Sequence, residues 1–428
     1  MRAVLLLGIV TGLAMAVYFS VLSVESPLAW DFIAYVEAAE AVLEGESFVG
    51  YEPIEAGGEY VYPPIVIFAF IPYAFIGDWE VAFIIHSIVN LGALAILAAL
   101  TISELRRLDV SLERLDRALI VAFFLVSLYP LVNIGLGQID PVIALLIAFV
   151  FIGSEAGHDR LTGGALSIAA IVKLFPLSFG LWLLFQRRFK SILFAAILFV
   201  AGVISSLIIF GIGTNRTYLE VIILERSRLR AFADGMVSPD FFSVTLIRPI
   251  SAIFPMIPPI LYLGISLAVV LPIIAYSYRR TLSHRDRHMA FLLTVLGLLI
   301  ALPSSNLNHL LYIYMPVIVL LFSLTSGRAR RWLAIGLGII LVPLQPAIIK
   351  GLLELTPMPT ATVEMIHQIV YMLLSVISVA LIGTIVILAA GVYYHRRTAT
   401  DLSRSTEGGD EIAQRLFGVV GLRDRTRQ

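Results

Sequence analysis

The chain contains no cysteine and few charged residues. Without thiols, disulfide bonds, thiol catalysis and cysteine-ligated metal sites are excluded. Only 14% of the 428 residues are charged, and the 30 basic and 30 acidic side chains cancel. A chain without net charge has no general attraction for nucleic acid. We therefore expect no nucleic-acid partner.

Apolar residues make up 59% of the sequence, and the mean hydropathy is +0.95. Repeated apolar runs of spanning length are typical of membrane helices. Residues 1–394 are therefore predicted to form an all-α polytopic bundle with about eleven to thirteen membrane segments. The first run, residues 3–22, is longer than a signal-peptide core and no clear cleavage motif follows it. We expect it to remain as the first membrane helix.

Basic clusters flank the apolar runs at 106–117, 187–190, 279–287, 328–331 and 396–397. The positive-inside rule places these clusters and the polar tail, residues 395–428, in the cytoplasm. The protein is then expected in the plasma membrane, with a large first loop, about residues 24–61, on the non-cytoplasmic side. Residues 62–77 either cross the membrane or re-enter it. Residues 161–186 form either one kinked helix or two helices broken near Lys173.

Asp31 closely follows the first apolar run and opens an acidic segment. In a helix over residues 30–44, a rotation of about 100° per residue places its glutamates on one stripe. Asp31 and Tyr35 then lie on roughly the opposite side, where an unpaired carboxylate is costly. The alternative is that Asp31 is a helix N-cap without a chemical role.

Polar residues also interrupt the apolar sequence near Gln138 and Lys173. In the turn GLGQIDP, Gln138 and Asp140 offer hydrogen bonds to a polar ligand, although the segment equally suits a plain turn before a proline. Lys173 is apolar on both sides for about ten residues and needs a carboxylate, an anionic ligand or a water-filled cavity.

In the expected topology, five arginines lie on the non-cytoplasmic side: Arg216, Arg226, Arg228, Arg230 and Arg248. Guanidinium groups suit phosphate, so we expect at least one to contact a lipid phosphate. Alternatively, neighbouring acids simply neutralise them. Asn308 and His309, on the same side, can donate hydrogen bonds to sugar hydroxyls or phosphate. The other histidines show no metal-ligand spacing, so no metal site is predicted.

Several short motifs occur in a characteristic order: the early Asp31, Tyr62-Pro63-Pro64, Gly137-Gln138, Lys173 with Pro176, Asp240-Phe241-Phe242-Ser243, and Pro303 to His309. This set resembles the GT-C glycosyltransferases, and most closely the family 87 enzymes that use polyprenyl-phosphate mannose. The resemblance covers about residues 1–325. The chain departs from the family pattern at Asp140, at Asp240 and at the single His309, which are expected substrate contacts.

The resemblance implies an inverting transfer of a sugar, mannose in the first instance, at the non-cytoplasmic face. The donor is expected to be a polyprenyl-phosphate sugar and the acceptor a lipid or glycan, with membrane lipids around the bundle. No cofactor is expected, and the use of a divalent metal stays open. Asp31 would be the general base, and Lys173, His309 or an arginine would neutralise the leaving phosphate. The expected substrate-binding residues are Tyr35, Tyr62, Gln138, Asp140, Lys173, Arg226, Arg228, Arg230, Asp240, Arg248, Asn308 and His309.

Three alternatives remain open from the sequence. A transporter or lipid flippase would also carry polar residues and broken helices in a bundle, but no internal repeat is visible. Another GT-C enzyme would transfer a different sugar, such as arabinose or glucose. A non-catalytic subunit would keep the fold without the chemistry.

Overall fold

The computed structural model describes residues 1–22, 28–52, 58–225, 230–232, 235, 237–239, 243–279, 281 and 283–397. Within these ranges the secondary structure is helical, apart from an isolated antiparallel bridge between Ser243 and Asn306. This confirms the predicted all-α membrane bundle.

The first half of the chain forms α1 (Arg2–Val17), η1 (Tyr18–Leu22), α2 (Trp30–Glu44), η2 (Pro64–Ala69), α3 (Ile71–Ala74), α4 (Trp79–Arg107), α5 (Arg114–Val126), α6 (Leu128–Leu136), α7 (Asp140–Ala156), α8 (Asp159–Val172), η3 (Phe175–Phe179), α9 (Gly180–Phe185) and α10 (Phe189–Thr217). The second half forms η4 (Tyr218–Glu225), η5 (Arg230–Phe232), α11 (Ile247–Ile253), α12 (Pro259–Tyr278), α13 (His284–Ala301), η6 (Leu307–Ile313), α14 (Tyr314–Ser323), α15 (Arg328–Ile340), α16 (Pro346–Glu354), α17 (Thr360–Val376) and a last helix, Val379–Arg397.

Six helical stretches among the described residues are long and apolar enough to cross a membrane: Arg2–Ser20, Trp79–Arg107, Arg114–Leu136, Phe189–Ile223, Pro259–Tyr278 and Val379–Arg397. Other apolar helices are shorter, such as Leu307–Ser323. The larger number of segments expected from the sequence stays a prediction.

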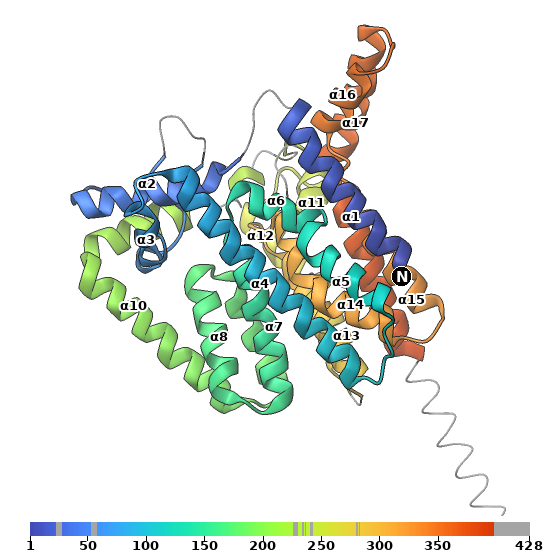
Figure 1. The fold of residues 1–428 in the computed structure, drawn as a ribbon, viewed down its shortest axis with the longest axis horizontal. Helices are drawn as coiled ribbons and strands as arrows, with labels where there is room; N and C mark the ends of the chain where they lie inside the picture. The colour runs from blue at the N-terminus through green and yellow to red at the C-terminus, as the bar shows by residue number, and fades with distance from the viewer. Residues whose placement is uncertain are drawn as a thin grey trace, which may run out of the picture.

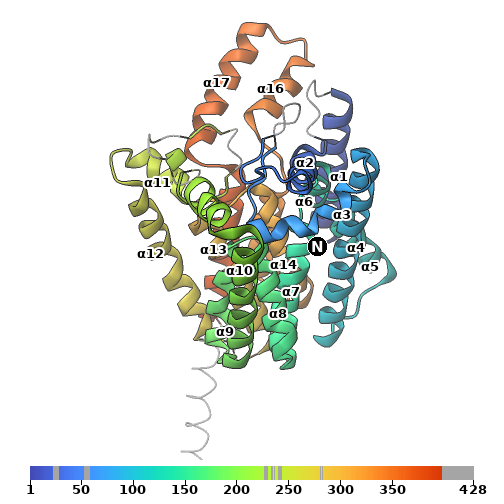
Figure 2. The ribbon, with the colours of Figure 1, turned by 90° about the vertical axis from the view of Figure 1, so that its left-hand side faces the viewer.

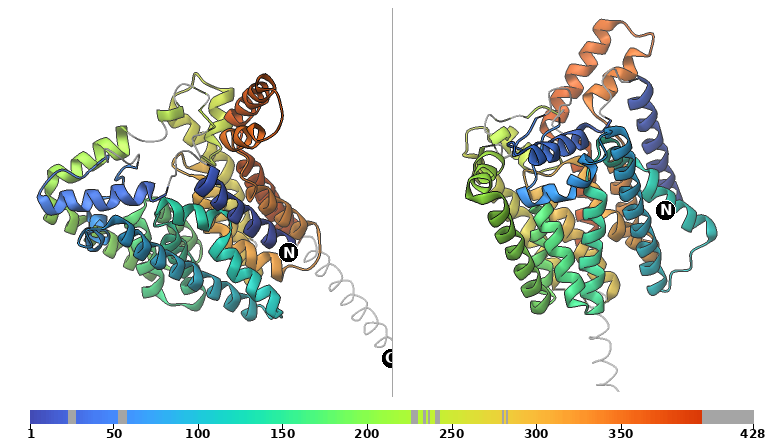
Figure 3. Two further views of the ribbon diagram at one scale, coloured as in Figure 1. Left: turned by 45° about the horizontal axis from the view of Figure 1, so that its top comes forward. Right: turned by 60° about the vertical axis from the view of Figure 1, so that its left-hand side comes forward.

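The long helices run along one axis of the molecule, and α2 lies across one end of the bundle (Figures 1 and 3). The hairpin of α16 and α17 projects beyond the other helices at this same end (Figure 2). α4 starts near this end and runs to the opposite end of the bundle (Figure 1).

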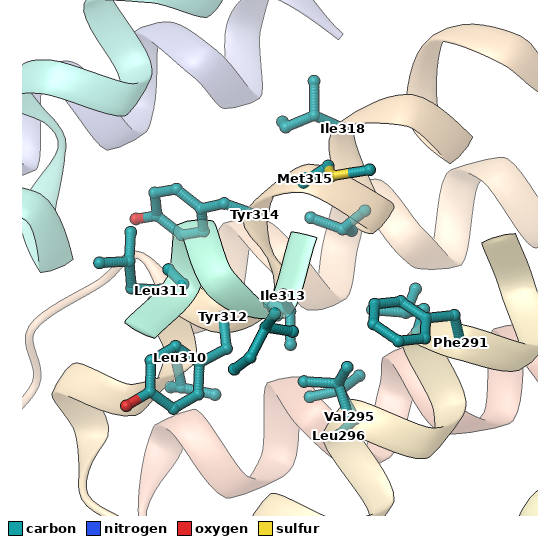
Figure 4. Close-up of a cluster of buried hydrophobic side chains, with 14 of the residues drawn as sticks. Phe291, Val295, Leu296, Leu310, Leu311, Tyr312, Ile313, Tyr314, Met315 and Ile318 are labelled. Atoms are coloured by element: carbon teal, nitrogen blue, oxygen red, sulfur yellow. The ribbon is translucent and has the colours of Figure 1, made fainter. Parts of the chain in front are cut away.

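The centre of the bundle is built on α13 and α14. From His288 to Ala301 every side chain of α13 is buried, as is every residue of α14. A helix that is apolar all round has to be enclosed by other helices. Figure 4 shows Phe291 and Val295 of α13 near Ile313, the last residue of η6, and Met315, in the first turn of α14. This core fixes the polar segment that immediately precedes α14.

Two breaks in the helical pattern position polar groups. α8 ends at Val172, and Lys173 has an extended backbone, with φ −134° and ψ 130°. Residues 161–186 are therefore separate helices broken at Lys173, one of the two predicted arrangements. Residues 62–77 contain only η2 and α3, which are six and four residues long. Neither is long enough to cross a membrane, because spanning takes about 20 helical residues.

Candidate functional site

The helix that carries Asp31 runs from Trp30 to Glu44, as predicted. Its N-cap is Ala29, which has a left-handed φ of 59° and donates its N–H to the carbonyl of Gly135 over 2.7 Å. The alternative that Asp31 is the N-cap is therefore wrong. Asp31 lies within the first turn and is partly buried. Tyr35 is buried and Glu40 is exposed, which confirms the predicted sidedness of the helix.

Asp31 accepts a hydrogen bond from Nε2 of Gln138 over 2.5 Å. The amide oxygen of Gln138 accepts from the Tyr62 hydroxyl over 3.4 Å, and this hydroxyl lies 3.2 Å from that of Tyr35. Asn90 in α4 donates to the backbone carbonyl of Gln138 over 2.9 Å. One chain of hydrogen bonds thus connects four residues that were predicted to belong to the site: Asp31, Gln138, Tyr62 and Tyr35.

Burial raises the pKa of the Tyr35 and Tyr62 hydroxyls well above 10. Both phenols therefore keep their protons at neutral pH. A protonated phenol can orient the Gln138 amide, and it cannot compete with Asp31 as a base.

Two glycines allow the backbone to approach Asp31 closely. Gly137 has a φ of 73°, and a Cβ there would lie 2.3 Å from Cβ of Phe32. A Cβ on Gly58 would lie 2.2 Å from the carbonyl oxygen of Trp30. Only glycine avoids these overlaps, so the turn before α7 and the loop before η2 both pack directly on the start of α2.

A second polar cluster surrounds Asp140 at the start of α7. Asp140 is fully buried, and its Oδ1 lies 2.6 Å from Nζ of Lys173. Tyr312 donates to the same oxygen, and Asn308 donates to Oδ2 over 3.1 Å. His309 Nε2 lies 3.2 Å from Nζ of Lys173 and 3.8 Å from Oδ2 of Asp140. The partner that Lys173 was predicted to need is therefore a carboxylate of the chain itself.

A cavity of about 660 Å³ opens beside Asp31. Asp31, Gln138, Asn308 and Arg248 are among its polar lining residues. Most of the remaining wall is apolar: Met15, Phe19, Leu128, Val132, Ile340 and Leu374 are among its residues. The predicted contacts Tyr35, Tyr62, Asp140, Lys173 and His309 do not line this cavity. Two of them contact residues that do line it: Tyr62 bonds to Gln138, and Asp140 bonds to Asn308.

Arg248 in α11 is buried and cross-links several segments. Its guanidinium donates to the Ser243 hydroxyl over 3.2 Å and to the carbonyl of Leu374 over 3.0 Å. It also donates to the carbonyls of Val237 and Ser238. Arg248 therefore joins Val237, Ser238 and Ser243 to the end of α17, and it lines the cavity.

Of the other four arginines expected on the non-cytoplasmic side, only the side chain of Arg216 is described. Arg216 forms an exposed ion pair with Glu220 over 2.8 Å, as the alternative of neutralisation by nearby acids predicted. Arg226, Arg228 and Asp240 lie outside the described residues, and for Arg230 the side chain does too.

Sequence reasoning missed Asn133 and Tyr312. Asn133 is buried in α6 and donates to the carbonyl of Asn308 over 3.2 Å. Both are polar residues within apolar helical runs. In a membrane protein this pattern itself indicates a functional position.

The prediction that the other histidines show no metal-ligand spacing is wrong for His284 and His288. Four residues apart on α13, they meet Glu104 of α4, with all three ligand atoms within 4.8 Å of one another. A spacing of i, i+4 on a helix places two side chains on one face, so the sequence itself indicates that these two histidines can share a ligand.

The model of glycosyltransferase family 87 matches residues 60–305 of the chain. The chain belongs to glycosyltransferase family 87. Among curated proteins, none matches it. Membership makes this protein a membrane glycosyltransferase, which transfers a sugar from a donor to a glycan or lipid acceptor. This favours the enzyme over the transporter alternative.

The matched region of the family 87 enzyme contains Tyr62, Gln138, Lys173 and Arg248. It begins after Asp31 and ends before Asn308. The cavity wall therefore combines residues from inside the matched region with residues from both flanks.

Proposed function

We propose that this family 87 enzyme has a GT-C-type mechanism and transfers mannose from a polyprenyl-phosphate donor, with Asp31 as the general base. The observation that carries the proposal is the position of Asp31. Its carboxylate lines a largely apolar cavity inside a membrane bundle, held by Gln138.

The cavity suits an amphipathic substrate. A polyprenyl phosphate joins a long apolar chain to a charged sugar-bearing head, and the cavity joins an apolar wall to a polar end at Asp31, Gln138 and Asn308. Burying isoprene units against such a wall contributes about 0.8 kcal/mol for each CH₂ group. A nucleotide sugar has no apolar chain to fill this wall.

Asp31 is placed to accept a proton from an entering hydroxyl. In the proposed step the acceptor O–H gives its proton to Asp31 while its oxygen attacks the anomeric carbon. The bond from this carbon to the phosphate oxygen breaks, and polyprenyl phosphate leaves with the electron pair. A single displacement inverts the anomeric configuration, and a positioned base contributes about 10²–10⁴-fold.

The leaving phosphate needs cationic or hydrogen-bonding support. Arg248 and Asn308 line the cavity, whereas Lys173 does not. We therefore assign phosphate contact to Arg248 and Asn308. Lys173 and His309, which do not line the cavity, would add positive charge near the phosphate.

The charge distribution supports a non-cytoplasmic site. Basic residues 106, 107, 285 and 287 lie where α4 ends and α13 begins, at the end of the bundle opposite α2 (Figure 1). The positive-inside rule places that end in the cytoplasm. Asp31 and its cavity then face the other side, and the C-terminus is cytoplasmic.

The direct test is a donor panel with the purified full chain in lipid nanodiscs. Polyprenyl-phosphate mannose, polyprenyl-phosphate glucose, polyprenyl-phosphate arabinose and GDP-mannose are offered with a lipid extract as acceptor. We expect transfer from polyprenyl-phosphate mannose and inverted configuration of the product by NMR. Transfer from GDP-mannose alone, or a product with retained configuration, would overturn the proposed donor or mechanism. Transfer from another polyprenyl-phosphate sugar would change only the sugar.

A further inference from the structure

A cluster of potential metal ligands lies far from Asp31. α4 contacts the candidate site through His86 and Asn90, which bond to the carbonyls of Gly137 and Gln138. Glu104 is 18 positions further along the same helix than His86. At 1.5 Å for each residue this separates them by about 27 Å. The cluster around Glu104 is therefore at the opposite end of the bundle.

Three side chains converge in this cluster. Oε2 of Glu104 lies 2.8 Å from Nε2 of His284 and 3.2 Å from Nε2 of His288. Ligand atoms around a tetrahedral ion at about 2.1 Å stand about 3.4 Å apart. Two of the three separations are thus close to the spacing that a zinc ion requires, and all three lie within 4.8 Å.

A further carboxylate orients one of the histidines. Nδ1 of His284 lies 3.0 Å from Oε2 of Glu155, and the same oxygen accepts from Nε of Arg287 over 2.6 Å. Metal-bound histidines commonly donate their second ring N–H to a carboxylate, which fixes the ring and its tautomer. Glu155 therefore stands where this supporting group belongs.

The burial of the cluster gives a second, independent observation. The His288 side chain is fully buried, and its Nδ1 has no hydrogen-bond partner. The other ring nitrogen, Nε2, faces Glu104 over 3.2 Å and is the atom that would bind an ion. The carboxylates of Glu104 and Glu155 are also buried, with 6% and 4% of their side chains exposed. Arg287 already pairs with Glu155 over 2.6 Å and Arg107 with Glu104 over 3.6 Å, which leaves Oε2 of Glu104 to the two histidines.

We infer that Glu104, His284 and His288 form a binding site for a divalent transition-metal ion, with Zn²⁺ as the fitting species. Two imidazoles and one carboxylate are a ligand set that zinc accepts, with the fourth position filled by water. The ion ties the start of α13 to the end of α4. It would act as a clamp between these helices, outside the sugar-transfer site.

The test is zinc binding by the tag-free full chain in detergent, after removal of metal by chelator. We expect one Zn²⁺ for each chain, measured by calorimetry and elemental analysis, and a visible absorption band of tetrahedral type when Co²⁺ replaces Zn²⁺. Glu104→Gln and His288→Asn should each weaken zinc binding at least about 100-fold. Glu155→Gln should weaken it about 10- to 100-fold.

His367→Ala is the matched control, because His367 lies on α17, near Glu364 and outside the cluster. This variant should bind zinc like the unchanged chain. The site is refuted if the unchanged chain binds no zinc, or if Glu104→Gln and His288→Asn bind it normally. Equal loss in His367→Ala would also refute it. Circular dichroism of each variant shows that lost binding is not lost folding.

Discussion

Asp31 and Asp140 are two aspartates at the same end of the bundle in opposite situations. Asp140 is fully buried and faces Lys173, Tyr312 and Asn308. Asp31 is partly buried, lines the cavity and accepts from Gln138. A carboxylate that an ammonium neutralises at 2.6 Å has little tendency to take up a proton. The comparison supports Asp140 as the group that holds the site together and Asp31 as the group that meets substrate.

The largest effect should come from breaking the buried ion pair. Lys173→Met leaves the Asp140 carboxylate buried without its cation, which costs about 3–5 kcal/mol. We expect a much lower apparent Tm in detergent, measured by intrinsic fluorescence. Lys350→Met is the control, because Lys350 pairs with Glu364 over 2.7 Å in an exposed position. An exposed pair is worth at most about 1 kcal/mol, so equal effects would contradict the assigned role of Asp140.

The packing of the turn before α7 against α2 should be the next most sensitive feature. Gly137→Ala places a Cβ 2.3 Å from that of Phe32 at a φ of 73°. We expect a loss of about 1–3 kcal/mol in stability and a large loss of activity, since Gln138 would move away from Asp31. Gly135→Ala is the control, because a Cβ there meets nothing within 4 Å. Similar Tm and activity in both variants would refute this positioning.

A smaller effect is expected from removing the donor to Asp31. Gln138 donates to the carboxylate and so favours its charged form. In Gln138→Met the carboxylate holds a proton more tightly, and a base must be deprotonated to act. The acidic limb of the pH–rate profile should therefore move to higher pH. A shift to lower pH would show that Asp31 does not act as the base.

The local features of the site were predictable from sequence. The helix over 30–44, the turn around Gln138 and the break at Lys173 all rest on short-range patterns, and each is present. The need of Lys173 for a partner followed from its apolar neighbours.

The pairings between distant segments were not predictable. Asp140 and Tyr312 meet over 172 positions, and Glu104 and His284 over 180. Such contacts depend on which helices pack together, and local periodicity carries no information about that. The sequence alone therefore predicts Asp140 as a substrate contact and does not show that His284 meets Glu104.

The most direct test of the account compares Asp31→Asn with Glu40→Gln in single-turnover transfer from polyprenyl-phosphate mannose. Both changes remove one carboxylate from α2 without altering side-chain size, and Glu40 is exposed. Asp31→Asn should slow transfer about 10²–10⁴-fold while the donor still binds, and Glu40→Gln should leave the rate within about twofold. Transfer by Asp31→Asn at the rate of the unchanged enzyme would contradict the assignment of Asp31 as the base.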